Sequence, residues 1–315
     1  MKILEEVKGA KTIGIGGHIR PDGDCVGSCM GLYLYLKKAL PDVETDVYLE
    51  QPADFFSCIQ DIDRIHCSEV PDKTYDVFIV LDCAKDRLGN AEPLFEKAAK
   101  RINIDHHISN TGCGDVNVIE PERSSTCELL YELLDTAYLD VECAKALYIG
   151  IIHDSGIFQY SNTSPRTLQI AADLIGYGFD FPKLIDETFH EKTYVQNQIM
   201  GRVVLESIRF LDGKCIAGIV DKKMMNFYQT SPKDLDGIVN QLRIVKGVEC
   251  AIFMYETAPM EYKVSLRSQD AVDVSKIAVA FGGGGHRKAA GCTMQGTYHD
   301  VINNLSIHIA EQLNA

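Results

Sequence analysis

The chain has 315 residues, of which 46% are hydrophobic and 24% charged, and its formal net charge is −14. This length exceeds the size at which a single hydrophobic core keeps growing, so we expect two domains. The acidic balance argues against binding of long duplex nucleic acid, which depends on many contacts between Lys or Arg and phosphate. No apolar run is long enough to cross a membrane.

Two further features predict a cytoplasmic protein. The N-terminus lacks the apolar core and cleavage site of a signal peptide. The 11 cysteines are scattered without a Cys-x-x-Cys pair, which favours reduced thiols over a disulfide framework.

The first half of the chain alternates short apolar runs with helical patterns. The predicted strands are 11–16, 45–49, 75–81 and 101–104, and the predicted helices are 25–40, 91–99, 129–134, 141–152, 167–176 and 182–189. This alternation is typical of an α/β fold with a mostly parallel sheet flanked by helices. Ligands of such sheets bind at the carboxyl ends of the strands, so residues that follow different strands should come together there.

A helix at 194–207 is predicted to lead into a second, smaller α/β domain. We expect a first domain at 1–188, a linker that starts in 189–198 and a second domain at 199–315, with the active-site cleft between the domains. The second domain is predicted to contain strands at 214–220, 249–255 and 261–266 and helices at 234–242, 274–280 and 298–313. The run Gly282–Gly285 before His286 is either a flexible hairpin or a nest of amides around an anion.

Acidic residues and histidines follow several predicted strands and helices of the first domain. The oxygen and nitrogen donors, without thiolate, are His18, Asp22, Asp24, Asp82, His106 and Asp154. This set suits Mn²⁺ or Mg²⁺, although Co²⁺ and Zn²⁺ also bind such donors. Because four carboxylates repel one another, we expect two divalent cations. Two metals about 3.5–4 Å apart can polarise a phosphoryl oxygen and lower the pKa of a water.

Each of these signals has a simpler explanation when it stands alone. Asp22-Gly23-Asp24 is most often a turn, and Ser124-Ser125-Thr126 most simply begins a helix. Arg267, at the end of a predicted strand, is commonly a solvated residue. The metal site is favoured because its residues lie at the ends of several strands and helices, where they can meet in one place. For Ser125, the helix-cap interpretation is preferred.

The motifs resemble those of the DHH phosphoesterase family, which is named after the run found at Asp105–His107. The segment His18–Asp24, Asp82 after an apolar strand, and His153–Gly156 occur in the order typical of that family. Gly283–His286 resembles the glycine-rich motif of the family's associated C-terminal domain. The chain is most similar to the nanoRNase/pAp phosphatases of this family.

The resemblance implies roles for individual residues. It implies one Mn²⁺ held by His18, Asp22 and Asp82, and another held by Asp24, Asp82, His106 and Asp154. Asp105 would orient a ligand histidine, and His107 would stabilise the scissile phosphate or donate a proton. The other phosphate and the terminal nucleotide of the substrate would be bound by Arg267, Gly283, Gly284, Gly285 and His286.

The implied reactions are hydrolysis of short oligoribonucleotides (nanoRNA) to 5′-mononucleotides and of pAp to AMP and phosphate. A phosphodiesterase preferring pApA, from cyclic di-AMP turnover, would share the scaffold. An inorganic pyrophosphatase is less favoured because its Ser-Arg-Lys-Lys-Gln signature is absent. A non-catalytic nucleotide sensor is less favoured because every ligand position is filled. Aromatic residues of the second domain are candidates for base stacking, and base rates favour a homodimer.

Overall fold

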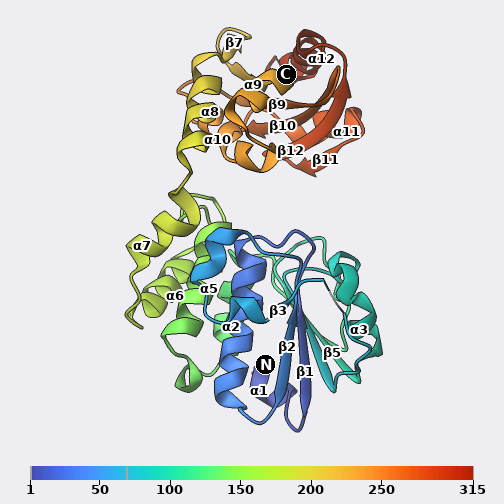
Figure 1. Cartoon of the computed structure of the whole chain (residues 1–315), viewed down its shortest axis with the longest axis vertical. Coiled ribbons are helices and arrows are strands. Elements are labelled where there is room, and N and C mark those ends of the chain that lie inside the picture. The colour runs from blue at the N-terminus through green and yellow to red at the C-terminus, as the bar shows by residue number, and fades with distance from the viewer. Residues whose placement is uncertain (1, 69, 315) are drawn as a thin grey trace. The chain divides into compact units, whose positions relative to one another are not determined.

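The structure, a computed structural model, describes residues 2–68 and 70–314. The chain folds into two compact units that divide between Glu191 and Lys192. Each unit contains a six-stranded sheet with helices packed on it (Figure 1). The predicted α/β fold class is therefore confirmed.

The sheet of the first unit is parallel throughout, with strand order β3-β2-β1-β4-β5-β6. Its strands are β1 (Thr12–Gly16), β2 (Glu44–Tyr48), β3 (Ile65–His66), β4 (Val77–Leu81), β5 (Lys100–Asp105) and β6 (Val116–Ile119). Its helices are α1 (Ile3–Glu6), α2 (Gly23–Ala39), α3 (Glu92–Lys97), α4 (Thr126–Leu133), α5 (Val141–Asp154), α6 (Pro165–Ile175) and α7 (Phe181–Ile185).

Strand β4 shows why this sheet is covered on both faces. Successive side chains of a strand point to opposite faces. Val77, Ile79 and Leu81 enter the core formed with α2, α4, α5 and α6, while Phe78 and Val80 enter a smaller core on the side of α3. A strand buried on both faces is a nearly continuous apolar run, which is why this one is conspicuous in the sequence.

The strand order also determines where a ligand can bind. Strands β1 and β4 are neighbours, but the chain leaves β1 toward β2 and leaves β4 toward β5, on the opposite side. In open parallel sheets a crevice forms at such a reversal, outside the carboxyl ends of the two strands. His18 follows β1 and Asp82 follows β4, so both lie at this position.

The second unit has a mixed sheet of order β11-β12-β10-β9-β8-β7, in which only β8 and β9 are parallel among the described strands. Its strands are β7 (Ile208–Phe210), β8 (Cys215–Val220), β9 (Cys250–Ala258), β10 (Glu261–Ser268), β11 (Gly284–His286) and β12 (Ala289–Gln295). Its helices are α8 (Tyr194–Leu205), α9 (Lys222–Tyr228), α10 (Ile238–Arg243), α11 (Val274–Ala280) and α12 (Tyr298–Leu313).

Several elements differ from the prediction. Strands β3, β6, β7 and β12 and helix α9 were not predicted, and the glycine run forms strand β11. The helix expected at 234–242 begins only at Ile238, because Gly237 has φ +83° and a 3₁₀ turn precedes it. The helix expected at 182–189 is α7 followed by a π-helical turn, Asp186–His190. Within the described ranges, no helix is long and apolar enough to span a bilayer.

Candidate active site

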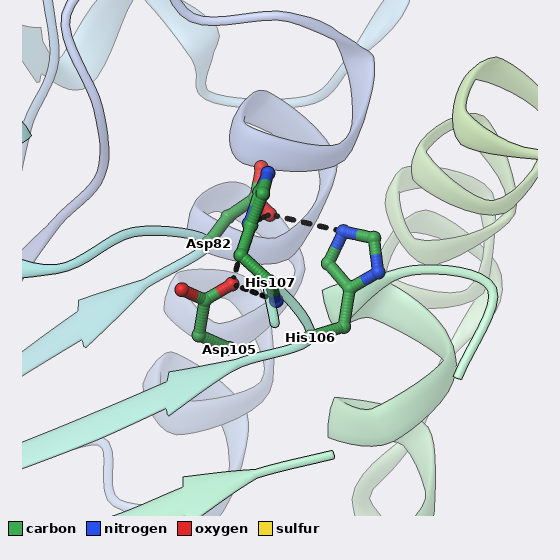
Figure 2. A group of neighbouring side chains, drawn as sticks. All are labelled: Asp82, Asp105, His106 and His107. Carbon is green, nitrogen blue, oxygen red and sulfur yellow. Dashed lines mark hydrogen bonds and ion pairs between the residues drawn. The ribbon is translucent and has the colours of Figure 1, made fainter. Parts of the chain in front are cut away.

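Asp82 stands at the centre of the candidate site. It follows β4 with φ +61°, a left-handed conformation that Asp tolerates better than most residues, and its backbone N–H donates to the Ile104 carbonyl at 3.1 Å. Its carboxylate is buried. Oδ2 lies 3.4 Å from His18 Nε2. Oδ1 lies 3.6 Å from His106 Nε2 (Figure 2). The two oxygens thus face different histidines.

His18 and Asp22 lie on one side of Asp82. The Nδ1–H of His18 donates to the Ile19 carbonyl at 2.8 Å, which leaves Nε2 as the atom that faces the carboxylates. Asp22 Oδ1 lies 3.5 Å from this nitrogen. Asp22 is also the N-cap of α2, because its side chain accepts hydrogen bonds from the N–H groups of Asp24 and Cys25.

His106, Asp24 and Asp154 lie on the other side. His106 Nδ1–H donates to the Arg123 carbonyl at 3.3 Å, and its Nε2 lies 3.1 Å from Asp154 Oδ2 and 3.8 Å from Asp24 Oδ2. Asp154 is the last residue of α5. The Asp24 oxygens accept from the N–H groups of Thr126 and Cys127 at 2.6 and 2.9 Å. They therefore occupy the positive end of helix α4.

The protein concentrates negative charge here. Burial, with the nearby Asp154 carboxylate, raises the pKa of Asp24 to about 6. Burial and the neighbouring Asp24 carboxylate raise the pKa of Asp82 well above its usual value. Burial alone would lower the pKa of His106, but contacts with Asp154 and Asp24 raise it to about 10. The raised pKa values of Asp24 and Asp82 indicate that the chain supplies too little positive charge to compensate their carboxylates.

The residues at this site fit divalent cations. His18 and His106 each use Nδ1–H on a backbone carbonyl and present Nε2, an arrangement common in metal-binding histidines. Possible ligand atoms within 4.8 Å of one another form three groups: His18, Cys25 and Asp82; Asp24, His106 and Asp154; and Asp82, Asp105, His106 and His107. The Cys25 thiol belongs to the first group, although the predicted donor set contains no sulfur.

Asp105 and His107 form a separate pair next to Asp82. Asp105 Oδ1 accepts from His107 Nδ1–H at 2.7 Å and from its backbone N–H at 3.0 Å. Asp105 was expected to orient a metal-binding histidine, but its partner is His107, the residue expected to face the substrate. The reason is geometric, since Asp105 and His107 are two residues apart at a strand end, whereas His106 points to the other side (Figure 2).

Two buried asparagines support this pair and were not identified from the sequence. Asn110 Nδ2–H donates to Asp105 Oδ2 at 2.6 Å and to Asn103 Oδ1 at 3.0 Å. Asn103 in turn donates to the Cys83 carbonyl at 2.8 Å. Asn103 could have been recognised from the sequence, because it is a polar residue inside an apolar strand. Buried amides are nearly always hydrogen-bonded.

The turn before α4 connects both sides of the site. Ser125 Oγ accepts from Glu128 N–H at 3.0 Å, so the helix-cap interpretation of Ser125 is confirmed. Thr126 donates its hydroxyl to Asp82 Oδ1 at 3.0 Å. The buried Glu128 carboxylate accepts from Ser124 and Thr167 hydroxyls at 2.5 and 2.7 Å. This turn therefore holds Asp24 and Asp82 in place.

Thr126→Val is expected to weaken metal activation because it removes the donor to Asp82 but keeps the side-chain shape. Loss of such an outer partner typically costs about 10- to 100-fold in metal affinity or activity. The measurement is the Mn²⁺ concentration that gives half-maximal activity. Thr126→Ser keeps the hydroxyl and serves as the control. A Val variant activated at the wild-type concentration would contradict this role.

In the second unit, two of the predicted substrate-binding residues share one row of the sheet. Arg267 on β10 and His286 on β11 both pair with Ala289 on β12. Residues directly opposite one another point to the same face. Arg267 Nη1–H also donates to the Leu266 carbonyl at 3.0 Å. The two cation-capable side chains thus flank a small alanine.

The glycine run leads from a turn at Gly282 into strand β11, which contains Gly284 and Gly285. The N–H groups of Gly282 and Gly283 donate to the Val279 and Ala278 carbonyls at 3.0 and 2.8 Å. These two amides are therefore engaged within the chain, and an anion site formed by the later part of the run stays a prediction. Close packing explains why position 283 is a glycine, because a Cβ there would overlap the Gly291 carbonyl oxygen. A Cβ on Gly284 would meet no atom within 4 Å.

Gly283→Ala is expected to lower the free energy of unfolding by about 1–3 kcal/mol, the usual cost of overpacking. Gly284→Ala is the matched control and should change stability less, because the added methyl group enters open space. Urea denaturation of the two variants measures the difference. Equal stabilities would contradict the close approach of β11 and β12.

Comparison with known proteins agrees with these motifs. The model of the DHH family N-terminal domain matches residues 12–151, and that of the DHHA1 domain matches residues 214–314. The bifunctional oligoribonuclease and PAP phosphatase NrnA of Thermus thermophilus is 30% identical, over 94% of this chain and 87% of its own length. The protein of the same name from Bacillus subtilis is 26% identical, over 90% and 89%.

A solved structure shows the same fold. The exopolyphosphatase-related protein of Bacteroides fragilis superimposes with a TM-score of 0.88 at 24% identity, covering 98% of this chain and 95% of that one. The motifs, both domain matches and the relatives agree. The chain therefore belongs to the DHH family of phosphoesterases and is a hydrolase of phosphoric esters.

Proposed function

We propose that the chain hydrolyses short oligoribonucleotides to 5′-mononucleotides, and pAp to AMP and phosphate. The observation that carries this proposal is that residues following β1, β4 and β5 meet residues of α2 and α5 around the Asp82 carboxylate. Carboxylate and imidazole groups at this density suit metal-assisted attack on a phosphate. The substrate class is supported by the names of the relatives, which describe oligoribonucleases and PAP phosphatases.

The site would hold two divalent cations, with Mn²⁺ preferred and Mg²⁺ or Co²⁺ as alternatives. We assign His18, Asp22 and Asp82 to one cation and Asp24, Asp82, His106 and Asp154 to the other. When bound, the cations would neutralise the scissile phosphate and lower the pKa of an attacking water. Asp82 is suited to be shared because its two oxygens face different histidines.

His107 would act on the substrate rather than on the cations. Its Nδ1–H is engaged by Asp105, so Nε2 remains to hydrogen-bond a phosphate oxygen or protonate the leaving oxygen. In the second unit, Arg267 and His286 would bind another phosphate from the two sides of Ala289. Gly283, Gly284 and Gly285 would form part of this site, with the substrate approaching the backbone at Gly284, where a Cβ would meet no atom within 4 Å.

The chain's charge of −14 fits short substrates better than long duplexes, because few phosphates need to be neutralised. A cytoplasmic location and a homodimer stay predictions.

A substrate panel tests the proposal. Wild-type protein is incubated with pAp, pApA, a pentaribonucleotide, a long single strand and pyrophosphate, with Mn²⁺ or with EDTA. We expect 5′-mononucleotides from the short RNAs, AMP from pAp, and no reaction in EDTA. Cleavage of pApA alone would favour the cyclic di-AMP pathway enzyme. Degradation of only the long strand, or only of pyrophosphate, would overturn the proposal.

A further inference from the structure

An aromatic cluster lies beside the candidate metal site in the first unit. It consists of Phe55, Phe56, His153 and Phe189. The Phe55 and His153 rings are nearly parallel, with centroids 6.1 Å apart and an interplanar angle of 9°. Phe56 packs 4.4 Å from Phe55, and Phe189 packs 5.4 Å from His153. Three separate segments thus contribute rings to one cluster.

The cluster is in contact with the segment that carries the predicted metal ligands. A Cβ on Gly23 would overlap the His153 ring, so this ring lies directly against the backbone between Asp22 and Asp24. His153 also precedes Asp154, whose carboxylate lies 3.1 Å from His106. Phe55 is therefore separated from the metal-ligand segment by one ring.

Phe55 differs from the rest of the cluster in its exposure. Its side chain is 46% exposed, whereas that of its neighbour Phe56 is 1% exposed. A single exposed Phe needs no explanation by itself. Here, however, the ring is held by Phe56 and by the parallel His153 ring, so much of a fixed aromatic surface faces solvent next to a phosphate-processing site. The flanking π-helical turn at Asp186–His190 is a feature often found at functional sites.

A nucleobase matches such a surface. Every base has a π face, so stacking on an aromatic ring tolerates any sequence. Stacking also needs no positive charge, which suits the acidic first unit. We propose that Phe55 is the stacking platform for the base of the nucleotide whose phosphate is bound at the metal site. This inference rests on the proposed function. It places base binding in the first unit, whereas the aromatic candidates predicted from the sequence lie in the second.

The test compares substrates with and without a base. The variants are Phe55→Leu, which keeps an apolar side chain, Phe55→Trp, which keeps an aromatic plane, and the control Tyr138→Leu. Tyr138 is an aromatic residue that is 38% exposed and packs on Tyr35, outside the cluster. KM and kcat are measured for pAp and for ribose 3′,5′-bisphosphate. Binding of the 2-aminopurine analogue of AMP is followed by quenching of its fluorescence, which stacking causes.

For Phe55→Leu we expect the KM for pAp to rise roughly 5- to 150-fold, the range of base–aromatic stacking. The advantage of pAp over ribose 3′,5′-bisphosphate should disappear. Quenching should be lost in Phe55→Leu but kept in Phe55→Trp and Tyr138→Leu. Undiminished quenching in Phe55→Leu, or an equal rise of KM for both substrates, would contradict the proposal that Phe55 stacks on the base. If wild type hydrolyses neither bisphosphate, the proposed function fails, while the quenching measurement still decides the role of Phe55.

Discussion

Asp82→Asn is expected to abolish hydrolysis, with a loss of about 10³-fold or more. The reason is that the variant removes a charge assigned to both cations, each of which supplies several kcal/mol of transition-state stabilisation. Asn, like Asp, tolerates the left-handed backbone that position 82 adopts with φ +61°. The backbone should therefore be unchanged, and the effect can be assigned to the carboxylate. The measurement is kcat on pAp with saturating Mn²⁺.

In the metal-free protein, the same variant is expected to keep or raise the stability of the fold. Burial raises the pKa of Asp82 in the folded chain, so its ionised form opposes folding. The folded state then binds more protons than the unfolded state, and stability falls as pH rises from the usual pKa toward the raised one. Metal-free Asp82→Asn should thus melt at or above the wild-type temperature at pH 7, while Mn²⁺ raises its melting temperature less. A melting temperature raised by Mn²⁺ as much as in wild type would remove Asp82 from the metal site.

Asp105→Asn is expected to lower kcat by about 10²-fold or more, within the range that a positioned acid–base group contributes. Asp105 accepts the Nδ1–H of His107, which fixes the orientation of the ring. An Asn side chain cannot supply the negative charge. KM should change less than kcat, because Asp105 itself is not assigned to the substrate and the second unit keeps its phosphate-binding residues.

A double-mutant comparison distinguishes this role from a general structural one. Adding Asp105→Asn to His107→Asn should cause little further loss of kcat, because Asp105 would act only through His107. Asn110→Ala, which removes the other partner of Asp105, should give a smaller loss than Asp105→Asn. If the factors by which the two single variants lower kcat multiply in the double variant, Asp105 acts independently of His107.

The sequence predicted those parts of the fold in which side-chain pattern and burial agree. The run before Asp82 is apolar on both faces, and it is indeed the central strand β4. Strand β6 was missed because it is a partly exposed edge strand containing Asn117. Strand β12 was missed because Ala289-Ala290-Gly291 has little β-branched or aromatic character. Both strands depend on pairing partners that a local pattern does not contain.

The candidate site shows the same division. Histidines and aspartates at strand ends are visible in the sequence, because a parallel sheet gathers strand ends at one edge. The contact of Thr126 with Asp82 depends on where α4 packs, which no spacing in the sequence indicates. The pairing of Asp105 with His107 can be inferred from the sequence, because side chains two residues apart along a strand point to the same side. The contacts of Asn103 and Asn110 cannot be inferred in this way, because they depend on how the loop after the strand folds.

The buried Glu128 carboxylate joins the turn before α4 to Thr167 in the first turn of α6. Opening of α6 would therefore release a partner of the turn that holds Asp24 and Asp82. The converse also holds, since cations that bind only the folded site stabilise everything that must be ordered with it. Amide hydrogen exchange should thus slow in α4 and α6 together on addition of Mn²⁺, although α6 supplies none of the assigned ligands. We therefore expect the site and α6 to open and close as one cooperative unit.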